Sequence, residues 1–171
     1  MKSLKIGDKV VYPNQGLGVV EAIHEEAYNG ERFMVFNLRI ICNNTLVTVP
    51  SATALELGIR RPMSEASVRK VIQFIGDGDV DVTTDWKGRY KEHLNLMRSG
   101  TLYDMATVLK GLFFLSLQKP LSFREKKMME KAKDLIVSEI SEASATPRDK
   151  IEEKLLGALS RSFKPSKSRA A

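Results

Sequence analysis

Residues 19–41 read VVEAIHEEAYNGERFMVFNLRII, and this stretch decides the fold of the front of the chain. At its centre, Asn29-Gly30 is the dipeptide most typical of a two-residue turn between antiparallel strands, because both turn residues must take positive φ. The flanking segments 19–28 and 32–41 alternate imperfectly between apolar and polar residues, as a bent strand does. We therefore predict a β-hairpin here.

Further turn signals on both sides extend this hairpin into a sheet. Residues 9–13, KVVYP, end at a proline, and residues 14–18, NQGLG, predict a turn whose glycines can take positive φ. Asn43-Asn44 indicates another tight turn, and residues 45–50, TLVTVP, are rich in β-branched side chains. We expect about five strands within residues 1–60, closed into a small antiparallel barrel of the SH3-like or Tudor-like type, because closure removes exposed edges. Such a barrel has no room for a buried active site, and its strand edges suit a protein partner.

After residue 64 the spacing of apolar residues changes to that of helices. Helix starts are indicated by capping residues and by one proline, namely Ser64, Thr84 or Asp85, Thr101, Ser122 and Pro147. Residues 102–117 are apolar over much of their surface and predict the central helix of a bundle. The fold class is thus α+β with two domains: the barrel over residues 1–60 and an all-α helical bundle over residues 64–161. The basic tail, residues 162–171, predicts disorder.

The positive charge of the chain lies in its second part. The net charge is +6, yet residues 1–60 hold six Lys or Arg and six Asp or Glu. Residues 61–171 hold 21 and 15. This asymmetry indicates a polyanionic partner for the second part, with nucleic acid as the leading candidate. A net charge of this size is also ordinary for a soluble protein, so charge alone leaves both interpretations open.

The motifs of common enzymes and metal sites are missing from the sequence. It contains no P-loop, no dinucleotide-type glycine pattern, no HExxH and no Cys/His set with zinc spacing. The Asp-rich residues 77–81 lack the length and closing Glu of a calcium loop, which predicts an acidic loop. We expect His24 to be a solvated or half-buried strand residue and His93 to lie on a helix surface. The sequence therefore favours no enzyme, no cofactor, no metal and no small-molecule substrate.

Localisation follows from what the chain lacks. No apolar run approaches the roughly 18 residues that span a bilayer, and the first ten residues lack the apolar core of a signal peptide. Cys42 is the one cysteine and cannot form an internal disulfide, which fits a reducing compartment. We expect a cytoplasmic protein without a membrane partner.

Residues 83–93, TTDWKGRYKEH, contain the one tryptophan of the chain. If a helix starts at Trp86, Arg89 and Tyr90 share its face, and Lys87 and Lys91 flank it. A lone tryptophan is more commonly a core anchor. The alternative is an apolar wedge between base steps with cations on the flanking phosphates, or a ring stacked on an unpaired base. The residues alone leave both interpretations open.

The chain resembles the CarD-type bacterial transcription regulators over about residues 4–160. Four stretches carry the resemblance: GDKVVYPNQGLGVVEAI (7–23), VTVPSATALELGIR (47–60), WKGRYKEHLNLMRSG (86–100) and LSFREKKMMEKAKDLI (121–136). The resemblance implies that residues 1–60 form an RNA-polymerase-interacting Tudor-like barrel. It also implies that residues 64–161 form a helical domain that binds DNA at the upstream edge of the promoter bubble, with nucleoid association through the polymerase.

The resemblance also implies roles for DNA-binding residues. Trp86 would wedge into the minor groove at the upstream fork and slow collapse of the bubble. Arg89 and Lys91 would touch the DNA backbone, and Tyr90 would support the wedge or stack. Lys126 on the long helix would help to hold the DNA. A wedge and phosphate contacts read little sequence, so binding would be largely not sequence-specific.

The polymerase β subunit would be met by the last barrel strand through strand-edge pairing around Val47, Thr48 and Pro50. Thr48 and Glu26 occupy places where some family members have an Arg facing the polymerase, and Gly88 stands where the family often has Arg. The leading hypothesis is a non-enzymatic transcription regulator that stabilises the promoter open complex. The alternative is a protein–protein adaptor of RNA polymerase, or of another partner, without direct DNA contact.

Overall fold

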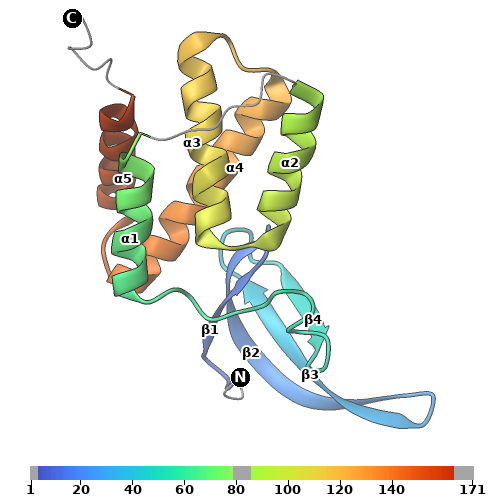
Figure 1. Cartoon of the computed structure of the whole chain (residues 1–171). Coiled ribbons are helices and arrows are strands. Elements are labelled where there is room, and N and C mark those ends of the chain that lie inside the picture. Colours follow the sequence, from blue (N-terminus) through green and yellow to red (C-terminus); the bar gives the residue numbers. More distant parts are fainter. Residues whose placement is uncertain (1–3, 79–85, 164–171) are drawn as a thin grey trace, which may run out of the picture. The chain divides into compact units, whose positions relative to one another are not determined.

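The computed structural model describes residues 4–78 and 86–163, with the exception of the side chains of Trp86 and Lys87. Within these ranges four strands precede five helices along the chain, so the protein is of the α+β class (Figure 1). The chain divides into two compact units. Residues up to Pro62, with Arg98–Gly100, make the sheet unit, and the remaining residues make the helical unit.

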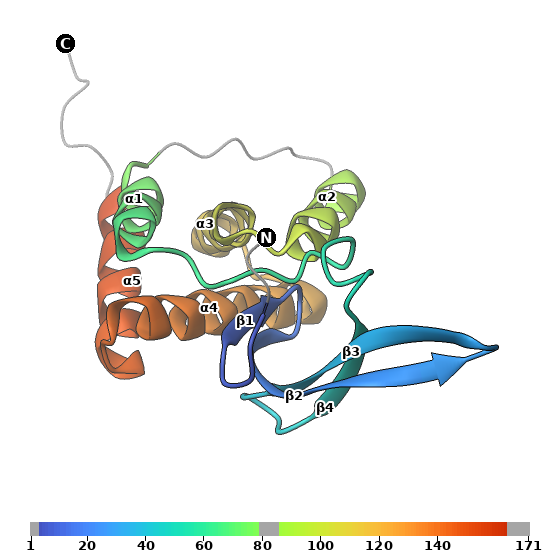
Figure 2. The ribbon, with the colours of Figure 1, turned by 90° about the horizontal axis from the view of Figure 1, so that it is seen from below.

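The sheet unit is one antiparallel sheet in which neighbours in sequence are neighbours in space. Its strands are β1 (Lys9–Tyr12), β2 (Gly16–Tyr28), β3 (Glu31–Ile40) and β4 (Leu46–Pro50). The predicted hairpin is confirmed, because Asn29 and Gly30 take φ of 50° and 82° between β2 and β3. Pro50, the last residue of β4, pairs with Val35. The hairpin therefore continues past β4 as a two-stranded arm, which Figures 1 and 2 show clearly.

The predicted small antiparallel barrel at the front of the chain is confirmed, and the structure shows it as a curled half-barrel. About five strands were expected, but the described part of the chain holds four, and within it no strand pairs with the outer edge of β4. Residues 51–58 form turns after β4, and Arg60 returns to Val11 of β1 as a single bridge. A register shift between Val20 and Ala22 bends β2, which explains the imperfect alternation in its sequence.

The core of the sheet unit is small and lies on one side of the curled strands. Its buried members come from β1 to β4 and from the segments before and after them: Leu4, Val10, Val20, Leu38, Val49, Ala54 and Ile59. The bend of β2 lets these side chains converge, so four strands are sufficient to cover the core.

The helical unit contains α1 (Glu65–Gly76), α2 (Trp86–Ser99), α3 (Leu102–Gln118), α4 (Phe123–Ser144) and α5 (Arg148–Ser162). Three predicted caps are confirmed. Ser64 and Thr101 accept hydrogen bonds from backbone N–H groups three residues on, at 3.3 and 3.1 Å, and Ser122 forms a full capping box with Glu125. Pro147 is the N-cap of α5 instead of its first residue. The predicted disorder is wrong for residues 162 and 163, because Ser162 ends α5, its hydroxyl donates to the carbonyl oxygen of Ile75, and Phe163 packs against the helical core. Residues 164–171 of the predicted tail, the predicted cap at Thr84 or Asp85 and most of the predicted acidic loop lie outside the described residues.

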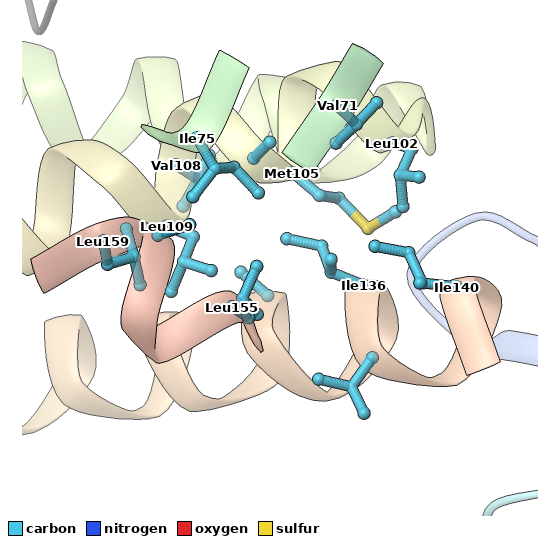
Figure 3. Close-up of a cluster of buried hydrophobic side chains, with 14 of the residues drawn as sticks. Val71, Ile75, Leu102, Met105, Val108, Leu109, Ile136, Ile140, Leu155 and Leu159 are labelled. Atoms are coloured by element: carbon cyan, nitrogen blue, oxygen red, sulfur yellow. The ribbon is translucent and has the colours of Figure 1, made fainter. Parts of the chain in front are cut away.

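Helix α3 lies at the centre of this unit, as predicted, with nine buried residues. Figure 3 shows side chains of α1, α4 and α5 that meet those of α3: Val71, Ile75, Leu102, Met105, Val108, Leu109, Ile136, Ile140, Leu155 and Leu159. Each such side chain contributes about 1.5–3 kcal/mol when fully buried. This packing fixes the helices, and with them the side chains at their ends.

Candidate functional site

The first turns of α2 and α4 are joined by an ion pair. The Nη2 of Arg89 donates to the Oε1 of Glu125 at 3.2 Å, and the side chains are only 5% and 12% exposed. Arg89 lies one turn into α2, and Glu125 is the third residue of α4. The starts of the two helices are therefore held side by side.

Glu125 is a well-anchored partner for Arg89. Burial raises the pKa of its carboxyl group, but hydrogen bonds from Ser122 and Arg89 outweigh burial, and the pKa is lowered overall. The backbone N–H of Ser122 donates to the Oε2 of Glu125 at 2.9 Å, and the backbone N–H of Glu125 donates to the Ser122 hydroxyl at 3.3 Å. Glu125 thus serves the cap of α4 and the pairing with α2 at once.

The expected contact of Arg89 with the DNA backbone is not favoured by this arrangement. The residue is 4% exposed, and its guanidinium group is directed to Glu125 inside the bundle. A phosphate cannot approach a buried cation without displacing its partner, which carries a large desolvation cost. In this structure Arg89 positions the start of α2, and its contact with the DNA backbone stays a prediction.

The other predicted DNA-binding residues have different surroundings. Lys91 and Lys126 are exposed, and Tyr90 is partly buried against the helical core. Trp86 is the first residue of α2, but its side chain lies outside the described residues, so its role as a wedge stays a prediction. The structure brings the helix segments that carry these residues together through the Arg89–Glu125 pair.

Helix α4 begins with a cationic and aromatic surface, which the sequence interpretation recognised only at Lys126. Arg124, Lys126 and Lys127 are exposed, Phe123 is 70% exposed, and the Lys127 Nζ lies 4.6 Å from the centroid of the Phe123 ring. We call these four residues the basic start of α4. The Ser122-x-x-Glu125 capping box was the available signal, because it fixes Phe123 as the first helical residue.

The expectation that His93 lies on the surface is wrong. His93 is 8% exposed, and a Cβ at Gly111 of α3 would lie only 3.4 Å from its Nε2. The pKa of His93 is lowered, and burial is the largest cause. The charge of Arg89 lowers this pKa further, whereas the charges of Glu92 and Glu125 raise it without cancelling the effect of burial. His93 therefore packs inside the helical unit, where it fits α2 against α3. His24, in contrast, is half-buried in β2, as predicted, with its Nε2 3.0 Å from the Oε1 of Glu26.

Lys110 is a buried cation that sequence reasoning missed within an apolar helix. It is 1% exposed, and its Nζ donates to the carbonyl oxygen of Phe74 and to the Oδ1 of Asp77, each at 2.7 Å. The same Nζ lies 4.3 Å from the centroid of the Phe74 ring. Lys110 thereby ties the end of α1 to α3, and the signal for it was a lysine within an otherwise apolar stretch.

A second candidate surface is the outer edge of β4. Two backbone hydrogen bonds show which residues of β4 bond to β3 and which are directed outward. The N–H of Ile40 donates to the carbonyl oxygen of Thr45, and the N–H of Ser51 donates to that of Met34, each at 2.8 Å. In this register Val47 and Val49 bond to β3, so the backbone N–H groups of Leu46 and Thr48 are directed outward. This geometry leaves an edge at which an added strand can pair.

The predicted polymerase-binding residues are only partly brought together. Val47, Thr48 and Pro50 share β4, where Val47 is partly buried against the core and Thr48 is exposed. The Thr48 hydroxyl donates to the Oδ1 of Asn37 at 3.0 Å. Glu26 lies on β2 opposite Phe33, past the end of β4 on the two-stranded arm. Glu26 is therefore not part of the β4 edge.

The residues that the structure describes contain no group of three or more His, Cys, Asp or Glu residues that could hold a metal ion. No helix within those ranges has the length and apolar character needed to cross a membrane.

Comparison with known proteins gave matches to both units. The family model described as "CarD, C-terminal domain" matches residues 70–156, and the model described as "CarD-like/TRCF RID domain" matches residues 4–63. The "Putative transcription factor YdeB" of Bacillus subtilis (strain 168) is 29% identical over 136 residues, which covers 80% of this chain and 89% of that protein. The solution NMR structure of the 72-residue N-terminal domain of Myxococcus xanthus CarD is 36% identical, with 34% of this chain and 79% of that chain covered and a TM-score of 0.31.

Proposed function

The chain belongs to the CarD family, and we propose that it regulates transcription by binding RNA polymerase through its sheet unit and promoter DNA through its helical unit. The general role in transcription is supported by the family models and by the name of the Bacillus relative.

The sheet unit binds the polymerase β subunit through the outer edge of β4. The outward N–H groups of Leu46 and Thr48 support this, because an added strand gains affinity from such main-chain hydrogen bonds. Thr48 and Pro50 lie on this edge. Val47 is partly buried against the core of the sheet unit and so attaches the edge to that core. Glu26 lies on the two-stranded arm, so any contact between Glu26 and the polymerase would be separate from the strand pairing at β4.

The helical unit binds DNA at its α2 and α4 end. The observation that carries this proposal is the Arg89–Glu125 pair, which fastens the first turn of α2 to the basic start of α4. The helix that begins at Trp86 is thereby held beside Lys126 and its neighbouring cations. A wedge at Trp86, supported by Tyr90, would then act at the fork while Lys91 and Lys126 contact phosphates.

The mechanism is a shift of equilibrium and not a chemical reaction. A protein that binds the open promoter better than the closed one stabilises the open state by the difference in binding free energy. Unstacking one base step costs a few kcal/mol, so a contact on that scale changes the lifetime of the open complex markedly. We therefore propose a non-enzymatic regulator.

Two variants test the two surfaces separately. Thr48→Pro removes one outward N–H from the edge, whereas Thr48→Ala keeps it and serves as the matched control. Replacing Arg124, Lys126 and Lys127 by Glu reverses the charge of the basic start of α4. We expect Thr48→Pro to lose retention on RNA polymerase. We expect the charge-reversed variant to stay bound to polymerase but to lose its effect on the half-life of open complexes after competitor challenge. An unchanged half-life with the charge-reversed variant would refute the DNA half of the proposal.

The adaptor alternative rests on the β4 edge alone, since a strand edge is sufficient to bind a protein partner. It differs in its salt dependence. If the helical unit contacts phosphates, affinity for forked promoter DNA falls steeply between 50 and 200 mM salt, because bound counterions are released. Absence of measurable association with forked DNA at low salt would favour the adaptor.

A further inference from the structure

Phe123 is an exposed aromatic side chain that the rest of the helical unit does not cover. It is 70% exposed, more than Leu117 at 58% or Leu156 at 42% in the same unit. As the first residue of α4 it follows Ser122, whose capping box with Glu125 fixes the first turn. The ring is therefore presented by an ordered helix start.

One cation lies over this ring, and three others are close to it in sequence. The Lys127 Nζ lies 4.6 Å from the ring centroid, and Lys119, Arg124 and Lys126 are exposed in the same stretch of chain. Glu125 is the one carboxylate between residues 119 and 127, and it is engaged by Arg89 and Ser122. An aromatic face bordered by cations is complementary to a nucleobase with its phosphates.

The location of Phe123 favours DNA over a protein partner. Glu125, two residues further along α4, holds Arg89 of α2, so the ring lies at the end of the unit where the proposed DNA contacts gather. A protein partner of complementary chemistry would need an acidic surface, whereas unpaired DNA offers both a stacking base and a chain of phosphates.

We propose that Phe123 stacks on an unpaired DNA base while Arg124, Lys126 and Lys127 contact the adjoining phosphates. The inference rests on the proposed function for the source of the opened DNA, and it adds a second aromatic contact to that of Trp86. It predicts a preference for DNA with an unpaired arm over a full duplex, because bases within a duplex already stack on one another.

A tryptophan placed at residue 123 reports on such stacking directly. In a Trp86→Phe background, Phe123→Trp makes this position the one source of indole fluorescence in the full-length chain. Tyr28→Trp in the same background is the matched control, because Tyr28 is also 70% exposed but lies on β2 with Glu26 two residues before it. We expect forked DNA with an unpaired arm to quench the indole at 123, saturating with the binding measured by anisotropy of labelled DNA. Duplex DNA should quench it less, and the indole at 28 should not respond.

Affinity gives a second measurement on the otherwise native chain. Phe123→Ala should weaken binding of forked DNA by about fivefold or more, the low end of the effect of removing one base-stacking ring, and Phe123→Tyr should retain it. Binding of forked DNA with neither quenching nor loss of affinity would overturn the stacking role and leave the proposed function intact. Failure of the native chain to bind forked DNA would overturn both. Loss of polymerase retention by Phe123→Ala at unchanged DNA affinity would reassign Phe123 to a protein contact and overturn the inference.

Discussion

Arg89 of α2 and Glu125 of α4 form a nearly buried ion pair at 3.2 Å, and Glu125 also caps α4 through Ser122. A single carboxylate therefore organises one helix and attaches a second to it. Because the basic start of α4 surrounds this carboxylate in sequence, the pair links the structural core of the helical unit to its candidate DNA surface.

Replacing Arg89 should destabilise the helical unit. Arg89→Met keeps the apolar part of the side chain but removes a hydrogen bond to a charged group, which costs about 2 kcal/mol in unfolding free energy. Urea denaturation measures the loss. Arg69→Met is the control, because the Arg69–Glu65 pair is 70% and 65% exposed and contributes about 0.5 kcal/mol or less. Equal losses in the two variants would contradict the positioning role of Arg89.

Lys110 should stabilise the attachment of α1 to α3. Lys110→Met retains a similar length but leaves the Phe74 carbonyl oxygen without this donor, at a cost of about 1–3 kcal/mol. Asp77→Asn keeps an acceptor for the Nζ, and Asp77 is 49% exposed, so it should cost less. Denaturation of the full chain compares them. A smaller loss for Lys110→Met than for Asp77→Asn would show that Lys110 is not the anchor.

His93 should make stability depend on pH in the mildly acidic range. Its folded pKa is lowered from 6.5, mainly by burial, so the unfolded chain binds a proton more readily than the folded chain as the pH falls. Stability is therefore fully present above about pH 6.5 and is lost as the pH falls from there through the folded pKa.

The urea midpoint measured between about pH 8 and pH 5 checks this dependence around the ordinary histidine pKa. His93→Gln should flatten it, whereas His24→Gln, in the sheet unit, should leave it in place. Glu125, whose pKa is also lowered, adds a loss of the same sign at lower pH. An identical pH dependence in the native chain and in His93→Gln would contradict the account.

Short-range features of the fold could be predicted from the sequence. The Asn29-Gly30 turn and the Ser122–Glu125 box depend on residues at most three apart, so their chemistry is visible in the sequence itself. Closure of the barrel could not be predicted in the same way. It depended on whether residues 51–60 return as a strand, and turns there leave only the Val11–Arg60 bridge.

Burial of polar residues in the candidate site was harder to predict. Arg89 and His93 lie four residues apart on one face of α2. The sequence of this helix is rich in charged residues, a pattern that predicts an exposed helix. Their burial depends on Glu125 and Gly111, which are distant in sequence. Lys110 likewise finds its partners 33 and 36 residues away. Such pairings are decided by packing, which a hydrophobic pattern does not specify.

The lifetime of promoter open complexes with Trp86→Ala tests the central proposal most directly. We expect native protein to prolong the half-life after competitor challenge, Trp86→Phe to retain part of this effect, and Trp86→Ala to lose most of it. Far-ultraviolet circular dichroism and retention on RNA polymerase should be unchanged in the variants. A folded, polymerase-bound Trp86→Ala protein that prolongs the half-life as much as the native protein would contradict the account.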